Sequence, residues 1–348
     1  TPIHDNVGSH AGTRGCALKA RDSAAHGTIT SVRPVRAVEG GRVVLEGSGF
    51  SPEDPPSITI GDQATRALFA SSSRIVISIP PEVEGRTPVR LDTLPGETVF
   101  VAVGAPCATG LHQVDNPVFD RHGHLFVTYS GSRGQEAPVS IFRVTAAGTR
   151  EAFASGIVNA TSMAFGPDGR LYVSSRFEGA VYRVDDDGTH EQVASDLGVA
   201  CGLAFDDEGW MYVGDRSGTI FRVRDGRATP FATLPPSVAA FHLAMSPERE
   251  LFVSGPTLGS YDHVHRIARN GDVSTVPAPF GRPQGLAFSP DGALHVVDAL
   301  AGASGLYRLD DADSAPQLVV AGSALVGVAF GPNGELVVAS NETAYRFE

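Results

Sequence analysis

The chain has 348 residues, 42% of them hydrophobic, and carries 39 acidic residues against 27 Lys and Arg, which gives a net charge of −12. Nucleic acid is a poor partner for such an acidic chain, because no basic cluster in the sequence could meet the phosphates. No apolar run reaches the roughly 18 residues of a membrane-spanning helix. The sequence therefore predicts a globular protein without a membrane span.

The first 26 residues are rich in Gly, Ala, Ser and His and show no apolar periodicity. We expect residues 1–26 to form an N-terminal arm, flexible alone and ordered only where it docks on the protein or on a partner chain. Because the chain begins at Thr1 without an apolar leader, we expect a secreted or periplasmic protein whose signal peptide has been removed. Cys16, Cys107 and Cys201 allow one disulfide, and whether Cys16 pairs with Cys107 stays open.

Short strands dominate residues 27–103. Ile29-Thr-Ser-Val-x-Pro34 opens this region, Gly40-Gly41 supplies a turn, and Val43-x-Leu-x-Gly-x-Gly-Phe50 follows. About seven short apolar runs separated by Gly and Pro predict a small β-sandwich. The pattern resembles the IPT/TIG immunoglobulin-like domain, and this resemblance implies a spacer, a dimerisation surface or an adhesive module.

A second pattern repeats six times from residue 104 to the end. Each copy holds an apolar pair, a Gly-containing turn, a second apolar run and an aromatic-Arg pair, and the apolar pairs recur every 40 to 46 residues. They are Val118-Phe119, Ala164-Phe165, Ala204-Phe205, Ala244-Met245, Ala287-Phe288 and Ala329-Phe330. A period of about 40 residues with four strands per unit is typical of a β-propeller. We therefore expect an all-β chain with a six-bladed propeller over 104–348 and blades that start near residues 115, 161, 201, 241, 284 and 326.

The stretch 101–108 has the apolar pattern of a fourth, outer strand, whereas the sixth repeat ends after its third strand. The simplest closure uses 101–108 as the outer strand of blade six, which removes an unpaired sheet edge. This arrangement predicts a stiff joint between the sandwich and the propeller.

Polar side chains gather at one predicted mouth of the propeller, where loops enter each innermost strand and leave each second strand. His242 and Asp298 are candidate catalytic groups, because an imidazole titrates near neutral pH and a carboxylate can act as a general base. The candidate ligand-binding residues are Asn116, Gln284, Asp215, His112 and Arg133. A hydrated channel with structural hydrogen bonds remains the alternative explanation for each of them.

The repeat resembles the six-bladed SMP-30/gluconolactonase and NHL propellers, on its Gly-Leu-Ala-Phe, Pro-Asp-Gly, Leu-Tyr-Val and aromatic-Arg elements. This resemblance implies a divalent cation, Ca²⁺ or Zn²⁺, in the channel, with Asp115 at the position of that family's metal-binding glutamate. The later family ligands, Asn or Asp before Gly-Leu, are replaced here by Cys201, Phe241 and Gln284. One carboxylate and one amide are few oxygen ligands for a hard cation.

Two functions therefore remain open. The first is an extracytoplasmic binding or scaffold protein that uses the mouth and the sandwich to hold a small molecule or a protein partner. The second is a metal-dependent lactone hydrolase, with Asp115 as ligand, His242 or Asp298 as base and Gln284 orienting the substrate.

Overall fold

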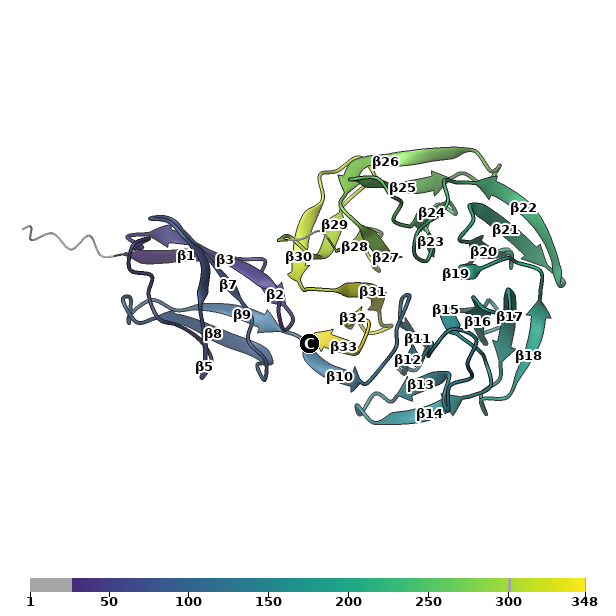
Figure 1. The fold of residues 1–348 in the computed structure, drawn as a ribbon, viewed down its shortest axis with the longest axis horizontal. Helices are drawn as coiled ribbons and strands as arrows, with labels where there is room; N and C mark the ends of the chain where they lie inside the picture. Colours follow the sequence, from purple (N-terminus) through teal and green to yellow (C-terminus); the bar gives the residue numbers. More distant parts are fainter. Residues whose placement is uncertain (1–26, 300–301, 348) are drawn as a thin grey trace, which may run out of the picture.

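The computed structural model describes residues 27–299 and 302–347, and over this range the chain is all-β. The expected N-terminal arm lies outside the described residues, and so does Cys16 of the possible Cys16–Cys107 pair. Figure 1 shows a small sandwich beside a ring of sheets that surrounds a central axis. The described part of the chain contains no helix that could span a membrane.

The sandwich consists of the strands β1 (Thr28–Arg33), β2 (Arg36–Ala37), β3 (Arg42–Ser48), β4 (Ile58–Ile60), β5 (Gln63–Thr65), β6 (Ala67–Ala70), β7 (Arg74–Ser78), β8 (Gly85–Leu91) and β9 (Val99–Val103). One sheet has the order β1-β3-β7-β6, and the other contains β9-β8-β4-β5. Alternate residues such as Val43 and Leu45, or Ile75 and Ile77, are fully buried. This period-two burial is what closes two sheets over one core.

The propeller consists of four-stranded units, here called blades, in which each strand pairs antiparallel with the next. The topology assigns strands β10–β33 to six of them, blades 1–6. The innermost strands are β11 (Val118–Phe119), β15 (Ala160–Phe165), β19 (Ala200–Phe205), β23 (His242–Met245), β27 (Pro283–Phe288) and β31 (Leu325–Phe330). The second strands are β12 (Leu125–Thr128), β16 (Leu171–Ser175), β20 (Met211–Asp215), β24 (Leu251–Ser254), β28 (Leu294–Asp298) and β32 (Leu336–Ser340).

The third strands are β13 (Ile141–Val144), β17 (Ala180–Val184), β21 (Thr219–Arg224), β25 (Asp262–Ile267), β29 (Gly305–Leu309) and β33 (Thr343–Phe347). The outer strands are β14 (Arg150–Ala154), β18 (His190–Ala194), β22 (Arg227–Thr233), β26 (Val273–Phe280), β30 (Gln317–Ala321) and β10 (Ala105–Thr109). β10 precedes the first blade in sequence but pairs with β33 of the last one. The ring is thus joined by strands from its two ends, which leaves no open edge there.

The repeated inner-strand phenylalanine packs between blades. Phe165 lies edge-on to Phe126 of the preceding blade, with ring centroids 5.6 Å apart. Phe205 and Phe288 make the same contact with Tyr172 and Phe252, at 4.8 and 5.1 Å. Edge-to-face aromatic pairs contribute beyond the area they bury. The repeated aromatic residues therefore hold neighbouring blades against each other.

The sandwich and the propeller share one sheet. The short strand β2 pairs in parallel with β9 of the sandwich on one side and with β30 of blade 5 on the other. Ala321 of β30 belongs to the sandwich core, and Gly104 alone separates β9 from β10. The joint between the two modules is therefore made of continuous backbone hydrogen bonds (Figure 1).

Candidate functional site

The mouth of the propeller is the end at which the innermost strands begin and the second strands stop. The strand register places these points together, because Ala200 is paired with Asp215, His242 with Ser254 and Pro283 with Asp298. Asp115 and Asn116 lie just before β11, at the same end. Residues from different blades can therefore meet around the axis at this end.

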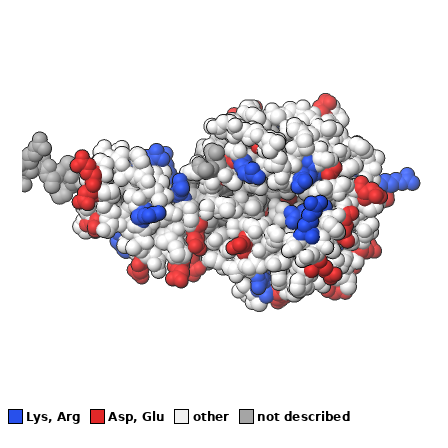
Figure 2. Space-filling model, in the orientation of Figure 1, with Lys and Arg blue, Asp and Glu red and all other residues white. Residues whose placement is uncertain are grey.

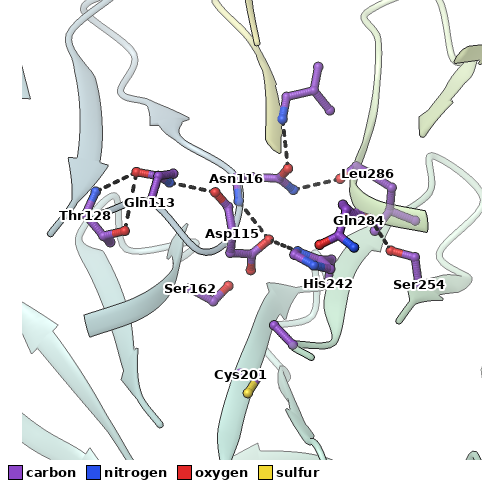
Figure 3. Close-up of polar contacts among 12 residues, drawn as sticks. Gln113, Asp115, Asn116, Thr128, Ser162, Cys201, His242, Ser254, Gln284 and Leu286 are labelled. Atoms are coloured by element: carbon purple, nitrogen blue, oxygen red, sulfur yellow. Dashed lines mark hydrogen bonds and ion pairs between the residues drawn. The ribbon is translucent and has the colours of Figure 1, made fainter. Parts of the chain in front are cut away.

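Asp115 and His242 form the buried centre of the site (Figure 3). Nδ1 of His242 lies 2.6 Å from Oδ1 of Asp115, and the two side chains are 0% and 2% exposed. The backbone N–H of Asn116 donates to the same carboxylate oxygen over 2.7 Å. Nε2 of His242 is buried and has no hydrogen-bond partner among the described residues. Nδ1 of the imidazole is thus held by Asp115, whereas Nε2 has no hydrogen-bond partner in the described part of the chain.

Gln113 holds Asp115 in place, and sequence reasoning missed it. Its Nε2 donates to the carbonyl of Asp115 over 2.6 Å, and its Oε1 accepts the backbone N–H of Thr128 over 2.8 Å. Asn341 Nδ2 donates to the carbonyl of Gln113 over 2.8 Å. A single glutamine outside the repeat carries no motif, so only the fold reveals this support for Asp115.

Asn116 bridges blades 5 and 6 with its side chain. Its Nδ2 donates to the carbonyl of Leu286 over 2.8 Å, and its Oδ1 accepts the N–H of Val328 over 2.9 Å. Gly285 and Gly327 leave room for it, since a Cβ on Gly285 would lie 2.2 Å from the Asn116 amide oxygen. These contacts give the Asn116 side chain a structural role. Ligand binding by Asn116 remains a prediction.

Asp215 and Asp298 are both used to fix loops at the mouth. Asp215 accepts the N–H of Val199 over 2.8 Å and the hydroxyl of Ser217. Asp298 accepts the N–H groups of Gly281 and Arg282 over 2.9 and 2.7 Å. Each carboxylate therefore ties the loop before an innermost strand to the end of its second strand. The roles predicted for them, ligand binding and catalysis, have no further support from these contacts.

The remaining predicted residues lie around the same opening. Gln284 is half-buried, and its backbone carbonyl accepts the hydroxyl of Ser254. His112 is half-buried and stands edge-on to Tyr129, with ring centroids 6.1 Å apart. Burial lowers the pKa of His112, and the Arg176 guanidinium lowers it further. His112 is thus neutral at neutral pH, while Arg133 is exposed to solvent.

Cys201 is a poor nucleophile in this site. Burial raises the pKa of its thiol to about 12, and Arg176 only partly opposes that shift. The thiolate is the reactive form of cysteine, so Cys201 stays protonated at neutral pH.

A cavity of about 330 Å³ follows the axis between the innermost strands. Its walls are apolar residues of all six strands, and its polar members are Asp115, Asn116 and Ser162. The buried polar centre thus lies between an apolar channel on one side and the mouth loops on the other.

The side chains around Asp115 do not fit the divalent cation that the family resemblance implies. Its carboxylate is held by His242 and by the N–H of Asn116. In the part of the chain that the structure describes, no group of three or more His, Cys, Asp or Glu residues is placed to hold a metal ion. The positions of the other expected ligands carry Cys201, Phe241 and Gln284. No catalytic step through a metal is derived from this site.

Comparison with known proteins supports both modules. Residues 28–96 match the model of the IPT/TIG domain. No curated protein sequence matches the chain significantly. The fold, however, is shared with many solved structures, and the chain has the all-β architecture of a sandwich followed by a β-propeller.

Three of these structures show the range of proteins with this fold. An auxiliary nutrient binding protein from Bacteroides thetaiotaomicron has a TM-score of 0.56 at 11% identity, with 92% of this chain and 97% of that chain covered. A gluconolactonase from Xanthomonas campestris has a TM-score of 0.54 at 14% identity, with 85% and 98% covered. Virginiamycin B lyase from Staphylococcus aureus has a TM-score of 0.51 at 16% identity, with 89% and 99% covered. At these identities the likeness defines the fold, and the activity has to be argued from the site.

Proposed function

We propose that the protein is an extracytoplasmic binding protein that takes up a small-molecule ligand at the propeller mouth. One observation carries this proposal: the acidic side chains singled out at the mouth are all engaged by donors of the protein itself. Asp115 holds His242, while Asp215 and Asp298 cap backbone N–H groups. Such a mouth is rigid and preorganised, which favours binding, and it offers few free groups for chemistry.

The likeness to the auxiliary nutrient binding protein, over 92% of this chain, supports this function. A nutrient-binding role also supports the secreted or periplasmic location expected from the sequence. The IPT/TIG module would then hold the propeller to a protein partner or to a larger assembly, which native mass spectrometry of the protein purified from its source would detect.

Hydrogen exchange tests where the ligand binds. Neutral sugars and sugar acids are screened by thermal shift, and each compound that raises the Tm is then examined by hydrogen exchange with mass spectrometry. We expect protection in the mouth loops, around 112–117, 199–202 and 281–284. Protection confined to the sandwich, or to the turns at the other end of the blades, would contradict the proposal.

A lactone hydrolase is the second candidate, and the Asp115–His242 pair favours it. When Nδ1 donates to a carboxylate, Nε2 of a neutral imidazole carries the lone pair and can accept a proton. Release of acid from a panel of lactones, measured with and without a chelator, tests this activity. Turnover that disappears in His242→Gln but persists with the chelator would establish a base that needs no metal, whereas no turnover above the spontaneous rate would exclude this candidate.

A further inference from the structure

Three arginines from neighbouring blades surround the mouth. Arg176 follows β16 of blade 2 directly, and Arg216 follows β20 of blade 3 at the equivalent position. Arg133 lies in the loop between β12 and β13 of blade 1. Because all three leave the end of a second strand, they lie at the same edge of the ring. Of the three, only Arg133 is among the ligand-binding residues predicted from the sequence.

The loop that carries Arg133 is fixed against blade 2. Asn159 donates to the carbonyls of Ser130 and Ser132 over 2.5 and 2.9 Å and accepts the N–H of Gly134 over 2.7 Å. A Cβ on Gly134 would lie 2.8 Å from the ring of Phe177, the residue after Arg176. Arg133 is therefore presented next to Arg176 by a clamped loop.

The positive charges of Arg216 and Arg133 are close enough to Arg176 to act on its guanidinium. Burial lowers the pKa of Arg176, the neighbouring Cys201 opposes that shift, and the positive charges of Arg216 and Arg133 lower the pKa further. Arg176 is half-buried, while Arg133 and Arg216 are exposed. Repulsion from their like charges raises the free energy of the charged Arg176 until a counter-charge arrives.

No Asp or Glu of the described residues forms an ion pair with these three arginines. Seven other arginines form ion pairs with Asp or Glu there, namely Arg33, Arg143, Arg170, Arg183, Arg249, Arg266 and Arg308. Arg133, Arg176 and Arg216 have no ion pair in the same part of the chain. Asp215 is adjacent to Arg216 in the chain, and its oxygens accept bonds from Ser217 and Val199 rather than from the Arg216 guanidinium.

The distribution of charge over the surface agrees with this arrangement. On the face seen in Figure 2, basic side chains lie near the centre of the propeller and most acidic ones lie toward its edge, while the sandwich carries both kinds. For a chain with a net charge of −12, a positive centre surrounded by negative charge would draw a small anion to the mouth.

We propose that the ligand of the mouth carries an anionic group, such as a carboxylate, sulfate or phosphate, that is bound by Arg176 and Arg216 with Arg133 at the rim. The planar guanidinium donates paired hydrogen bonds that match the oxygens of these groups. Neutral His112 adds a donor without adding charge. This inference rests on the proposed binding function and defines its ligand class as an organic acid or ester, such as an acidic sugar.

Calorimetric titration of the full chain with matched probes tests the inference. The probes are glucose and glucuronate, galactose and galacturonate, and inorganic phosphate. The variants are Arg176→Gln and Arg216→Gln, with Arg227→Gln as the matched control, because Arg227 is exposed at the start of β22 on the opposite end of blade 3. Circular dichroism and Tm show whether each variant is folded.

We expect at least one anion to bind, and its neutral parent to bind at least about tenfold more weakly. Loss of one charged hydrogen-bond donor should weaken binding of the anion by about tenfold or more, and added salt should weaken it too. Arg227→Gln should bind like the unaltered protein.

Two results would overturn the inference, and they are distinguishable. If the neutral sugars bind as well as their acids, and both mouth variants bind like the unaltered protein, the anionic class is wrong while the binding function remains. If no probe binds, neither the ligand class nor uptake of sugars and sugar acids at the mouth survives.

Discussion

His242 and Asp115 are separated by 127 positions in the chain, yet their side chains meet through a 2.6 Å contact between Nδ1 and Oδ1. One comes from the innermost strand of blade 4 and the other from the segment that precedes blade 1. Their contact crosses the axis of the ring and links parts of the propeller that share no strand pairing.

This contact predicts strong energetic coupling. Asp115→Ala leaves the buried Nδ1 of His242 without an acceptor, so we expect it to lower the free energy of unfolding by about 3–5 kcal/mol. Urea denaturation of Asp115→Ala, His242→Leu and the double variant forms a double-mutant cycle, in which we expect a coupling energy of about 1–3 kcal/mol. Additive effects of the two substitutions would show that the pair does not act as a unit.

Asn116 provides a test of the bridge between blades 5 and 6. Asn116→Asp keeps an acceptor for the Val328 N–H but loses the donor to the Leu286 carbonyl, whereas Asn116→Leu loses both. We expect Asn116→Leu to cost about 1–3 kcal/mol for each buried group left without a partner. We expect Asn116→Asp to be destabilising as well, because its carboxylate oxygen would face the Leu286 carbonyl oxygen. Thermal denaturation measures both variants, and an unchanged Tm in both would contradict the bridging role.

The buried side chain of His295 should make the free energy of unfolding depend on pH. Burial lowers the pKa of His295 to about 4, against an ordinary value of 6.5. Between these two values the unfolded chain binds the proton and the folded chain does not, so stability falls as the pH drops from 6.5 to about 4. The contribution of this residue is about 3 kcal/mol over the whole window.

The variant His295→Phe isolates this contribution, because Phe126 and Phe252 occupy the equivalent place in two other blades. Urea unfolding at several pH values should show a smaller loss of stability on acidification than in the unaltered protein. Equal slopes in the two proteins would rule out His295 as the source of the pH dependence.

We expect the thiol of Cys201 to react slowly with alkylating reagents. With its pKa raised to about 12 by burial, only about one thiol in ten thousand is ionised near pH 8. Iodoacetamide should therefore leave the Cys201 peptide unmodified in the folded protein and alkylate it rapidly in denaturant, as followed by peptide mass spectrometry. Rapid alkylation of the folded protein would mean that the thiol is accessible and activated.

The fold class could be predicted from the sequence because its signals are local. Alternating burial, Gly-containing turns and a pattern that recurs every 40 to 46 residues define strands and repeats without reference to distant contacts. The structure and the comparisons confirm an all-β chain with an IPT/TIG sandwich followed by a propeller.

The site could be predicted only as a set of positions at one mouth. Sequence position brings Asp115, His242 and Asp298 to the same end of the ring, but it cannot tell which carboxylate pairs with the imidazole and which caps a loop. Those choices depend on side-chain directions across blades. The arginine cluster was missed for the same reason, since Arg133, Arg176 and Arg216 are about 40 residues apart in sequence and form no basic run.

The two-residue strand β2 fixes the orientation of the sandwich relative to the propeller. Because β2 is hydrogen-bonded on one side to β9 and on the other to β30, the sandwich cannot rotate relative to the propeller without breaking at least one of these ladders. A partner that binds the sandwich would therefore also fix the direction in which the propeller mouth faces.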